Sequence, residues 1–190
     1  MDTLEQFVQD YLNGLRDVFD RFDTDAFNRV LQRILEAYHY DRFIFTMGNG
    51  GSAATASHFA ADLNKGCCLD LDKKFKMICL NDNMSTLLAL ANDVSYDSVF
   101  VEPLKNFFRP GDLVIGISGS GNSKNVLQAV AYAKEHGGHT IGLTGFSGGK
   151  LASLADIPFI VRVDDMQKVE DLHVIIIHMI MQAVYSALHP

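Results

Sequence analysis

The sequence predicts a single α/β domain built on a five-stranded parallel sheet. Short apolar runs of strand length alternate with helical stretches from residue 42 onward, and two of these runs end in loops rich in glycine and serine. Such alternation implies right-handed crossovers and a three-layer sandwich, with helices on both faces of the sheet. The 190 residues suit one domain. We expect residues 1–40 to form N-terminal helices and residues 41–190 the α/β core.

Two amphipathic helices are expected before the sheet. Apolar residues recur at helical spacing from Leu4 to Phe22. A second helix is predicted from about Thr24 to Tyr38, with Thr24 or Asp23 as its cap. These helices are expected either to cover one face of the sheet or to pack against a second subunit.

Five apolar runs are predicted to be the strands, and the segment between the third and fourth, residues 123–137, is predicted to be a crossover helix. The runs are 42–47, 76–80, 112–118, 139–144 and 159–163. In the flavodoxin-like or Rossmann-like order that this pattern favours, ligands bind beyond the carboxyl ends of the strands, where the strand order reverses.

The amino-acid composition argues against some binding partners and cellular locations. The formal net charge is −7 and we find no basic stripe, which argues against direct binding of nucleic acid. The three cysteines show no C-x-x-C spacing, and the N-terminus is acidic and amphipathic rather than like a secretory signal. The longest apolar run near the C-terminus, 174–177, is too short to span a membrane. We therefore expect a cytoplasmic protein away from membranes.

Two strands are followed by loops of the same kind, "GNGGSAATASHF" (48–59) and "SGSGNSKNV" (118–126). Small residues let backbone N–H groups approach a ligand, and the helix that follows each loop begins with unpaired N–H groups that suit a phosphate. Neither loop is a dinucleotide fingerprint or a P-loop, so a phosphomonoester is expected. The alternative is that the loops only punctuate strands. The predicted phosphate-binding residues are Asn49, Gly50, Gly51, Ser52, Ser118, Gly119, Ser120 and Ser123.

Histidines and carboxylates form two groups in sequence. His58 and Asp62 are four residues apart and share one face of a helix. Glu170, His173 and His178 lie in the C-terminal helical stretch. Two histidines and two carboxylates suit zinc or another divalent cation. The alternatives are an ordinary hydrogen bond between His58 and Asp62, and a core position for His178.

Four segments together resemble the sugar isomerase (SIS) domain and, more narrowly, the sedoheptulose-7-phosphate isomerases, also called phosphoheptose isomerases. The segments are "MGNGGSAATASHFAAD", "GISGSGNSKNV", "LTGFSGGKLASLAD" and "VEDLHVIIIH". The resemblance covers nearly the whole chain. It implies a five-stranded parallel sheet, a homotetramer with active sites at subunit interfaces, and a sugar phosphate held by the serine loops.

The resemblance also implies a metal site and shows where this chain departs from the family. The family's metal-binding His, Glu, Gln and His fall on His58, Asp62, Glu170 and His178, so two of the four positions differ. One hypothesis is that Glu170 supplies the carboxylate reach that the shorter Asp62 lacks. The family's serine loop reads S-T-S-G-N-S, and Gly119 stands at the threonine.

Other family positions complete the implied site. The basic residue that follows the family's Glu is represented only by Lys65. Asp93 matches an Asp that we interpret as a binder of sugar hydroxyls, with a helix cap as its alternative role. Gln167 and Asp165 precede or begin the last helix and are expected to line the site or to cap that helix.

The implied reaction is aldose–ketose isomerisation through an enediol, which needs a base at carbon and an acid–base group at oxygen. We assign Asp62 as the carbon base and His178 as its partner, and Glu170 could exchange roles with Asp62. One alternative is a non-catalytic tetrameric SIS protein that binds the DNA-replication initiator. Another is a sugar-phosphate sensor. The ligand-capable side chains favour chemistry, and the sequence has no helix-turn-helix segment to support the sensor.

Overall fold

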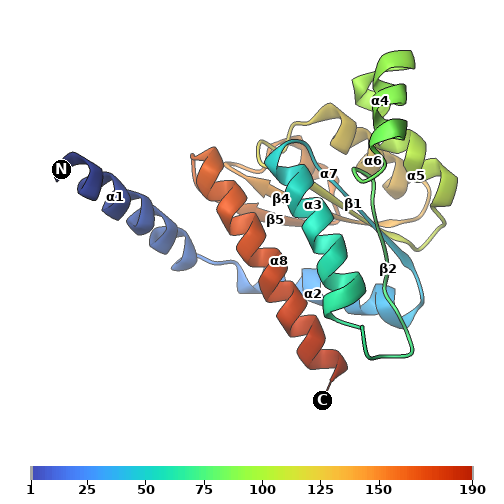
Figure 1. Ribbon diagram of the computed structural model, residues 1–190, viewed down its shortest axis with the longest axis horizontal. Coiled ribbons are helices and arrows are strands. Elements are labelled where there is room, and N and C mark those ends of the chain that lie inside the picture. The colour runs from blue at the N-terminus through green and yellow to red at the C-terminus, as the bar shows by residue number, and fades with distance from the viewer. Residues whose placement is uncertain (1, 190) are drawn as a thin grey trace.

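The computed structural model describes residues 2–189 and confirms the predicted parallel α/β sandwich (Figure 1). The strands pair in the order β2-β1-β3-β4-β5, and all four pairs are parallel. This is the flavodoxin-like order, and its reversal point lies between β1 and β3. The strands are β1 Phe43–Met47, β2 Lys76–Cys79, β3 Leu113–Ser118, β4 His139–Gly145 and β5 Ile157–Val161.

The last strand differs from its predicted bounds of 159–163. It begins at Ile157 and ends at Val161, so Arg162 and Val163 lie in the connection to the last helix. Pro158 is accommodated because β5 is an edge strand, where a missing backbone N–H leaves no ladder bond unmade on the outer side.

Eight α-helices surround the sheet in the described residues. Two of the connections are a π-helix, Asp62–Gly66, and a short 3₁₀-helix, Tyr96–Ser98. The α-helices are α1 Asp2–Phe19, α2 Thr24–His39, α3 Gly51–Ala61, α4 Met84–Asp93, α5 Val101–Phe107, α6 Lys124–Glu135, α7 Gly149–Leu154 and α8 Met166–Leu188.

Strand residues alternate between two apolar cores, one on each face of the sheet. Ile44, Ile115 and Ile141 belong to the core shared with α2, α3 and α8. Phe45 and Val114 belong to the core shared with α5, α6 and α7. This alternation follows from the two-residue period of a strand, and it fixes which helices lie on which side.

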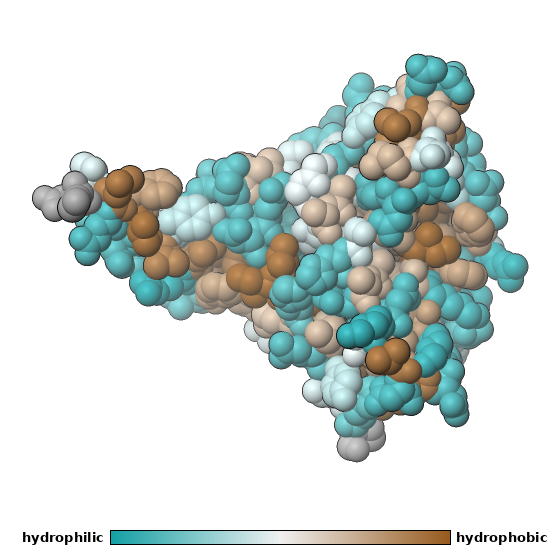
Figure 2. Space-filling model, viewed as in Figure 1, coloured by the Kyte–Doolittle hydropathy of each residue, from teal (hydrophilic) through white to brown (hydrophobic). Residues whose placement is uncertain are grey.

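The two N-terminal helices differ in how they pack against the rest of the chain. Helix α2 is capped by Asp23, whose carboxylate accepts from Ala26 N, and it buries Phe27, Val30 and Ile34 against the sheet. Helix α1 projects from the body, and Figure 2 shows hydrophobic residues along it. Five of its large apolar side chains are exposed: Leu4, Phe7, Val8, Leu12 and Phe19. Of the two N-terminal helices, therefore, only α2 covers the sheet within one chain.

Helix α8 is the one described helix whose length and composition would suit a membrane span. The apolar run 174–177 alone is too short to show this property, which belongs to the whole helix. Seven of its side chains, spaced from Val169 to Val184, are buried in the protein core. A core helix meets the same test of length and composition, so we draw no membrane assignment from α8.

His173 is fully buried on the core side of α8. Its Nε2 lies 3.1 Å from the carbonyl oxygen of Thr144 at the end of β4, and its Nδ1 has no partner among the described residues. Burial lowers the pKa of His173 to about 4, against an ordinary value of 6.5, while the bond to Thr144 opposes that shift. The side chain is therefore neutral in the folded protein at neutral pH.

This buried histidine predicts acid sensitivity. The pKa of His173 is lower in the folded than in the unfolded state, so between about pH 6.5 and pH 4 only the unfolded protein takes up a proton at this residue. The free energy of unfolding is therefore unaffected by this group above about pH 6.5 and falls as the pH drops toward 4. We expect His173→Gln to reduce the loss of unfolding free energy between pH 7 and pH 4 by about 3 kcal/mol. Urea denaturation at both pH values measures this, with the exposed His39→Gln as control. Equal pH slopes in wild type and His173→Gln would contradict it.

Candidate active site

The two glycine- and serine-rich loops lie side by side at the reversal point of the sheet, because β1 and β3 are paired neighbours. A pair of amide side chains joins them. Asn49 Nδ2 donates to Asn125 Oδ1 at 2.9 Å, and Asn125 Nδ2 donates to Asn49 Oδ1 at 3.0 Å. Tyr96 also donates to Asn49 Oδ1, at 2.8 Å. These bonds hold the start of α3 and the start of α6 in one arrangement.

The serine loop after β3 is ordered by its own hydrogen bonds. Ser118 Oγ lies 3.0 Å from Ser123 Oγ, and Asn122 N donates to Ser120 Oγ at 3.2 Å. Gly121 has a φ of +65°, and a Cβ there would collide with the backbone carbonyl of Gly148. Ser120 is exposed, whereas Ser118 is buried and Ser123 is partly buried. The loop thus presents hydroxyl groups at the carboxyl edge of the sheet.

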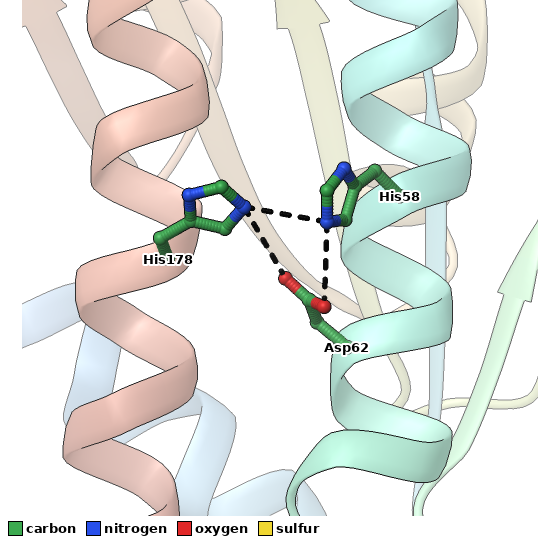
Figure 3. Close-up of side chains that lie close together, drawn as sticks. All are labelled: His58, Asp62 and His178. Carbon is green, nitrogen blue, oxygen red and sulfur yellow. Dashed lines mark hydrogen bonds and ion pairs between the residues drawn. The ribbon is translucent and has the colours of Figure 1, made fainter.

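Three of the four predicted metal ligands come together between α3 and α8 (Figure 3). His58 Nε2 lies 3.4 Å from Asp62 Oδ1 and 3.3 Å from His178 Nε2. His178 Nε2 lies 3.9 Å from Asp62 Oδ2. The two rings meet edge to face, with centroids 4.9 Å apart. One ligand atom from each residue lies within 4.8 Å of the other two.

Asp62 stands where α3 changes into the π-helix, and the i+5 bond from Cys67 N to Asp62 O (3.1 Å) marks the change. Its Oδ2 is buried and has no hydrogen-bond partner among the described residues. A buried carboxylate oxygen without a donor is costly, and a cation would compensate for that cost. Two imidazoles and a carboxylate are ligands that zinc accepts, so these residues fit a divalent metal.

His178 is not the core histidine that the alternative interpretation required. Its side chain is 42% exposed and that of His58 is 50% exposed, so the group opens to solvent. The buried histidine of α8 is His173 instead.

Glu170 lies away from these three residues. It is eight residues before His178 on α8, about 12 Å along the helix axis at 1.5 Å per residue. Its carboxylate lies against the first turn of α3, since a Cβ at Gly51 would be 2.6 Å from both Glu170 Cδ and Oε1. Within one chain, Glu170 therefore sits beside the predicted phosphate cradle and cannot supply the reach that Asp62 lacks.

The remaining predicted residues lie at or near the surface of other elements. Asp93 is exposed in the last turn of α4, where its Oδ1 accepts from Asn92. Gln167 is exposed in the first turn of α8, and its backbone N–H donates to Asp165 Oδ1. Asp165 thus has the capping role foreseen as its alternative. Lys65 is exposed on the π-helix.

Sequence reasoning missed the residues that join the loops. Asn125 lies within the quoted serine motif but was not singled out, and Tyr96 lies in a different connection. Asn81 also went unnoticed: it follows β2, accepts from Gly48 N at 3.1 Å and donates to Gly48 O at 2.8 Å. An asparagine after a parallel strand is the available signal, because such residues meet at the sheet edge.

Comparison with known proteins agrees with this geometry. The SIS domain pattern matches residues 6–145. A phosphoheptose isomerase of Mycobacterium tuberculosis is 39% identical over 184 residues, which cover 97% of this chain and 93% of that protein. A probable phosphoheptose isomerase of Thermoplasma acidophilum is 42% identical over 151 residues, 80% of this chain and 82% of that protein.

The chain belongs to the phosphoheptose isomerase family of SIS-domain proteins. The solved structure of a phosphoheptose isomerase from Neisseria gonorrhoeae superposes with a TM-score of 0.88 at 29% identity, covering 97% of this chain and 98% of that one. The family resemblance expected from the sequence is therefore confirmed. These relatives favour the isomerase interpretation over the scaffold and the sensor.

At Gly119, where the resemblance implies a threonine in the serine loop, a side chain of α8 occupies the space that the threonine side chain would need. A Cβ at Gly119 would lie 2.5 Å from Met166 Sδ and 3.6 Å from Val169 Cγ1. Met166 therefore occupies the space that a larger residue at position 119 would need. Gly119 and Met166 are complementary in size, and together they couple the serine loop to the start of α8.

This pairing predicts that the two positions are energetically coupled. Gly119→Thr should destabilise the protein by about 1–2 kcal/mol, because the new side chain overlaps Met166. In the Met166→Ala background the same substitution should cost at least about 1 kcal/mol less. Urea denaturation of the four proteins in this double-mutant cycle measures the coupling. Costs that add without a coupling term would show that Met166 moves aside freely.

Proposed function

We propose that the protein is a sugar-phosphate aldose–ketose isomerase that interconverts sedoheptulose 7-phosphate and the corresponding heptose phosphate through an enediol. The observation that carries this proposal is the group formed by His58, Asp62 and His178, in a chain that also places two serine- and glycine-rich loops side by side at the carboxyl edge of the sheet. The 39% identity to a phosphoheptose isomerase over nearly the whole chain supports the substrate class.

We assign proton transfer at carbon to Asp62 and proton transfer at oxygen to His178. Asp62 takes the proton from the carbon next to the carbonyl, and the released electron pair forms the carbon–carbon double bond of the enediol. His178 gives a proton to the carbonyl oxygen. Return of the proton to the former carbonyl carbon, with loss of the hydroxyl proton on the carbon that was deprotonated first, completes the exchange of carbonyl and hydroxyl. Each transfer needs groups within hydrogen-bond reach of the sugar, which a group open to solvent can provide.

Binding of the phosphate is assigned to the loop 118–123. The hydroxyl groups of Ser118, Ser120 and Ser123 and the first N–H groups of α6 supply donors. The start of α3, with Asn49 to Ser52, supplies further N–H groups, and Asp93 and Gln167 are assigned to the sugar hydroxyls.

We assign a divalent metal, zinc in our proposal, to His58, Asp62 and His178. A bound zinc would polarise the carbonyl and the adjacent hydroxyl of the sugar. The buried, unpartnered Oδ2 of Asp62 supports this assignment.

We also propose that the protein acts as a homotetramer with active sites at subunit interfaces. The exposed apolar side chains of α1 support assembly. Glu170 would join the metal ligands only if it came from another subunit, since within one chain it lies about 12 Å along α8 from His178. Light scattering of the purified protein tests the tetramer, and a monomeric mass would refute it. The buried free thiols of Cys67, Cys68 and Cys79 support the expected cytoplasmic location.

The base assignment predicts a loss of proton exchange. Incubation with sedoheptulose 7-phosphate in D₂O should place deuterium at C1 or C2 of the sugar. Asp62→Asn should reduce that rate by about 10²- to 10⁴-fold, the usual contribution of a positioned general base. NMR of the sugar measures the exchange. Asp72→Asn, an exposed change in another loop, serves as control. Full exchange activity in Asp62→Asn would remove Asp62 as the base.

The metal assignment predicts stoichiometric binding. Calorimetric titration of the metal-free protein with zinc should show one site per chain, and His58→Ala should weaken it by at least 10-fold. His39→Ala, an exposed histidine on α2, should leave it unchanged. Failure to bind zinc, manganese or nickel would refute the metal site. A catalytically inactive Asp62→Asn that still binds zinc would separate the base role from the ligand role.

The position of the Glu170 carboxylate predicts that this residue weakens binding of the substrate phosphate. Its carboxylate lies at the start of α3, where a phosphate would also be bound, so the two negative charges repel. Glu170→Gln, which restores the family's amide, should lower KM for the sugar phosphate several-fold and tighten binding of inorganic phosphate. Glu135→Gln, an exposed residue at the end of α6, is the control. Weaker phosphate binding in Glu170→Gln would show that the carboxylate assists the site.

A further inference from the structure

A cavity lies beside the edge strand β5. It has a volume of about 360 Å³ and is formed by the α1–α2 connection, the start of α2, the edge strand β5 and the inner side of α8. A volume of this size is in the range of small-molecule sites. None of the predicted site residues lines it.

Three arginines line this cavity: Arg21, Arg29 and Arg162. They are three of the seven arginines in a chain whose net charge is −7. Among the described residues, none of the three lies within 4.0 Å of a carboxylate, although Arg33, Lys76, Lys105 and Lys134 each pair with one. The three guanidinium groups therefore form no ion pair among the described residues, although Arg21 Nε donates to the backbone oxygen of Asp17 at 2.9 Å.

One carboxylate, Asp23, also lines the cavity. It is engaged as the cap of α2, where it accepts from Ala26 N at 2.8 Å. One acidic and three basic side chains leave an excess of two positive charges. A neighbouring cavity of about 390 Å³ shares Arg21 and Arg162 and adds Asp17 and Asp164, neither of which forms an ion pair with these arginines.

The floor of the cavity is apolar and partly aromatic. Phe22 and Phe159 contact each other with ring centroids 5.5 Å apart, and Leu172 and Ile176 of α8 complete the surface. Guanidinium groups bind phosphate with two parallel hydrogen bonds and stack on flat rings. The combination suits an anion carried on a flat, apolar body rather than a bare phosphate or a sugar.

We propose that this cavity binds a nucleoside monophosphate, with the phosphate on Arg21, Arg29 and Arg162 and the base on the floor formed by Phe22 and Phe159. The site is separate from the active site. Ile176 faces the cavity, and His178 is two residues later, so it points about 200° around α8 toward α3. The proposal does not depend on the isomerase activity.

The test is calorimetric titration of the full-length protein with AMP, GMP, adenosine and inorganic phosphate. We expect both nucleotides to bind more tightly than adenosine or phosphate, and excess sedoheptulose 7-phosphate not to displace them. Arg29→Gln and Arg162→Gln should each weaken AMP binding by about 10- to 100-fold, the effect of losing one hydrogen bond to a charged group. Arg162→Lys, which keeps the charge, should lose less.

Arg16→Gln is the matched control, because Arg16 is exposed on α1, donates to Asn13 and does not line the cavity. Circular dichroism establishes that each variant is folded. AMP binding that survives both arginine substitutions, or that competes with the sugar phosphate, would overturn the site. Phosphate binding as tight as AMP would overturn the ligand class. Absence of AMP binding, with a changed oligomeric mass in the arginine variants, would assign the cavity to a subunit contact instead.

Discussion

The packing of α3 against α8 is the contact on which the active site depends. Helix α3 presents Ala56 and Ala60 to the core that it shares with α8, so the two helix axes can approach closely. His58 and Asp62 come from one helix and His178 from the other, 120 residues later, and their nitrogen and oxygen atoms meet at 3.3–3.9 Å. Ile177 and Ile180 of α8, beside His178, belong to the same core. A substitution that separates these helices would therefore separate the three side chains, even if it lies outside the group.

The positions of the strands could be predicted because buried parallel strands are short apolar runs with clear punctuation. The bounds of β5 could not, because Pro158 signals a strand end unless the strand is known to be an edge. His58 and Asp62 could be paired from their spacing alone, since four residues make one helical turn. Their meeting with His178 required the resemblance, and the bonds of Asn125 and Tyr96 to Asn49 required the tertiary structure. Whether α1 covers the sheet was undecidable from sequence, because an apolar stripe looks the same whether it faces its own core or another subunit.

Asp62 stands where the resemblance implies a glutamate, and its shorter side chain is accommodated locally. Each carboxylate oxygen of Asp62 faces a different histidine, at 3.4 Å and 3.9 Å, although the side chain is one methylene shorter. The π-helix that begins at Asp62 changes the backbone path at this residue, and π-turns within helices are frequent at functional sites. Local backbone geometry, rather than a second carboxylate, is therefore the feature of this chain that accompanies the shorter side chain.

Because Glu170 does not compensate for the shorter side chain of Asp62, the carboxylate at position 170 needs a different explanation. A negative charge at the start of α3 is favourable for the helix itself, because the first N–H groups there are unpaired and partially positive. These N–H groups at the start of α3 also form half of the expected phosphate cradle. Glu170 and the substrate phosphate would therefore compete for the same hydrogen-bond donors. The first turn of the helix after the serine loop contains no acidic residue, and the carboxylate of Asp97 there is paired with Lys124 Nζ at 3.9 Å. We therefore expect the proposed phosphate site to depend mainly on Ser118, Ser120 and Ser123. Met166, which occupies the space beside Gly119, lies one turn of α8 before Glu170, so the two departures from the family alter the same side of the site.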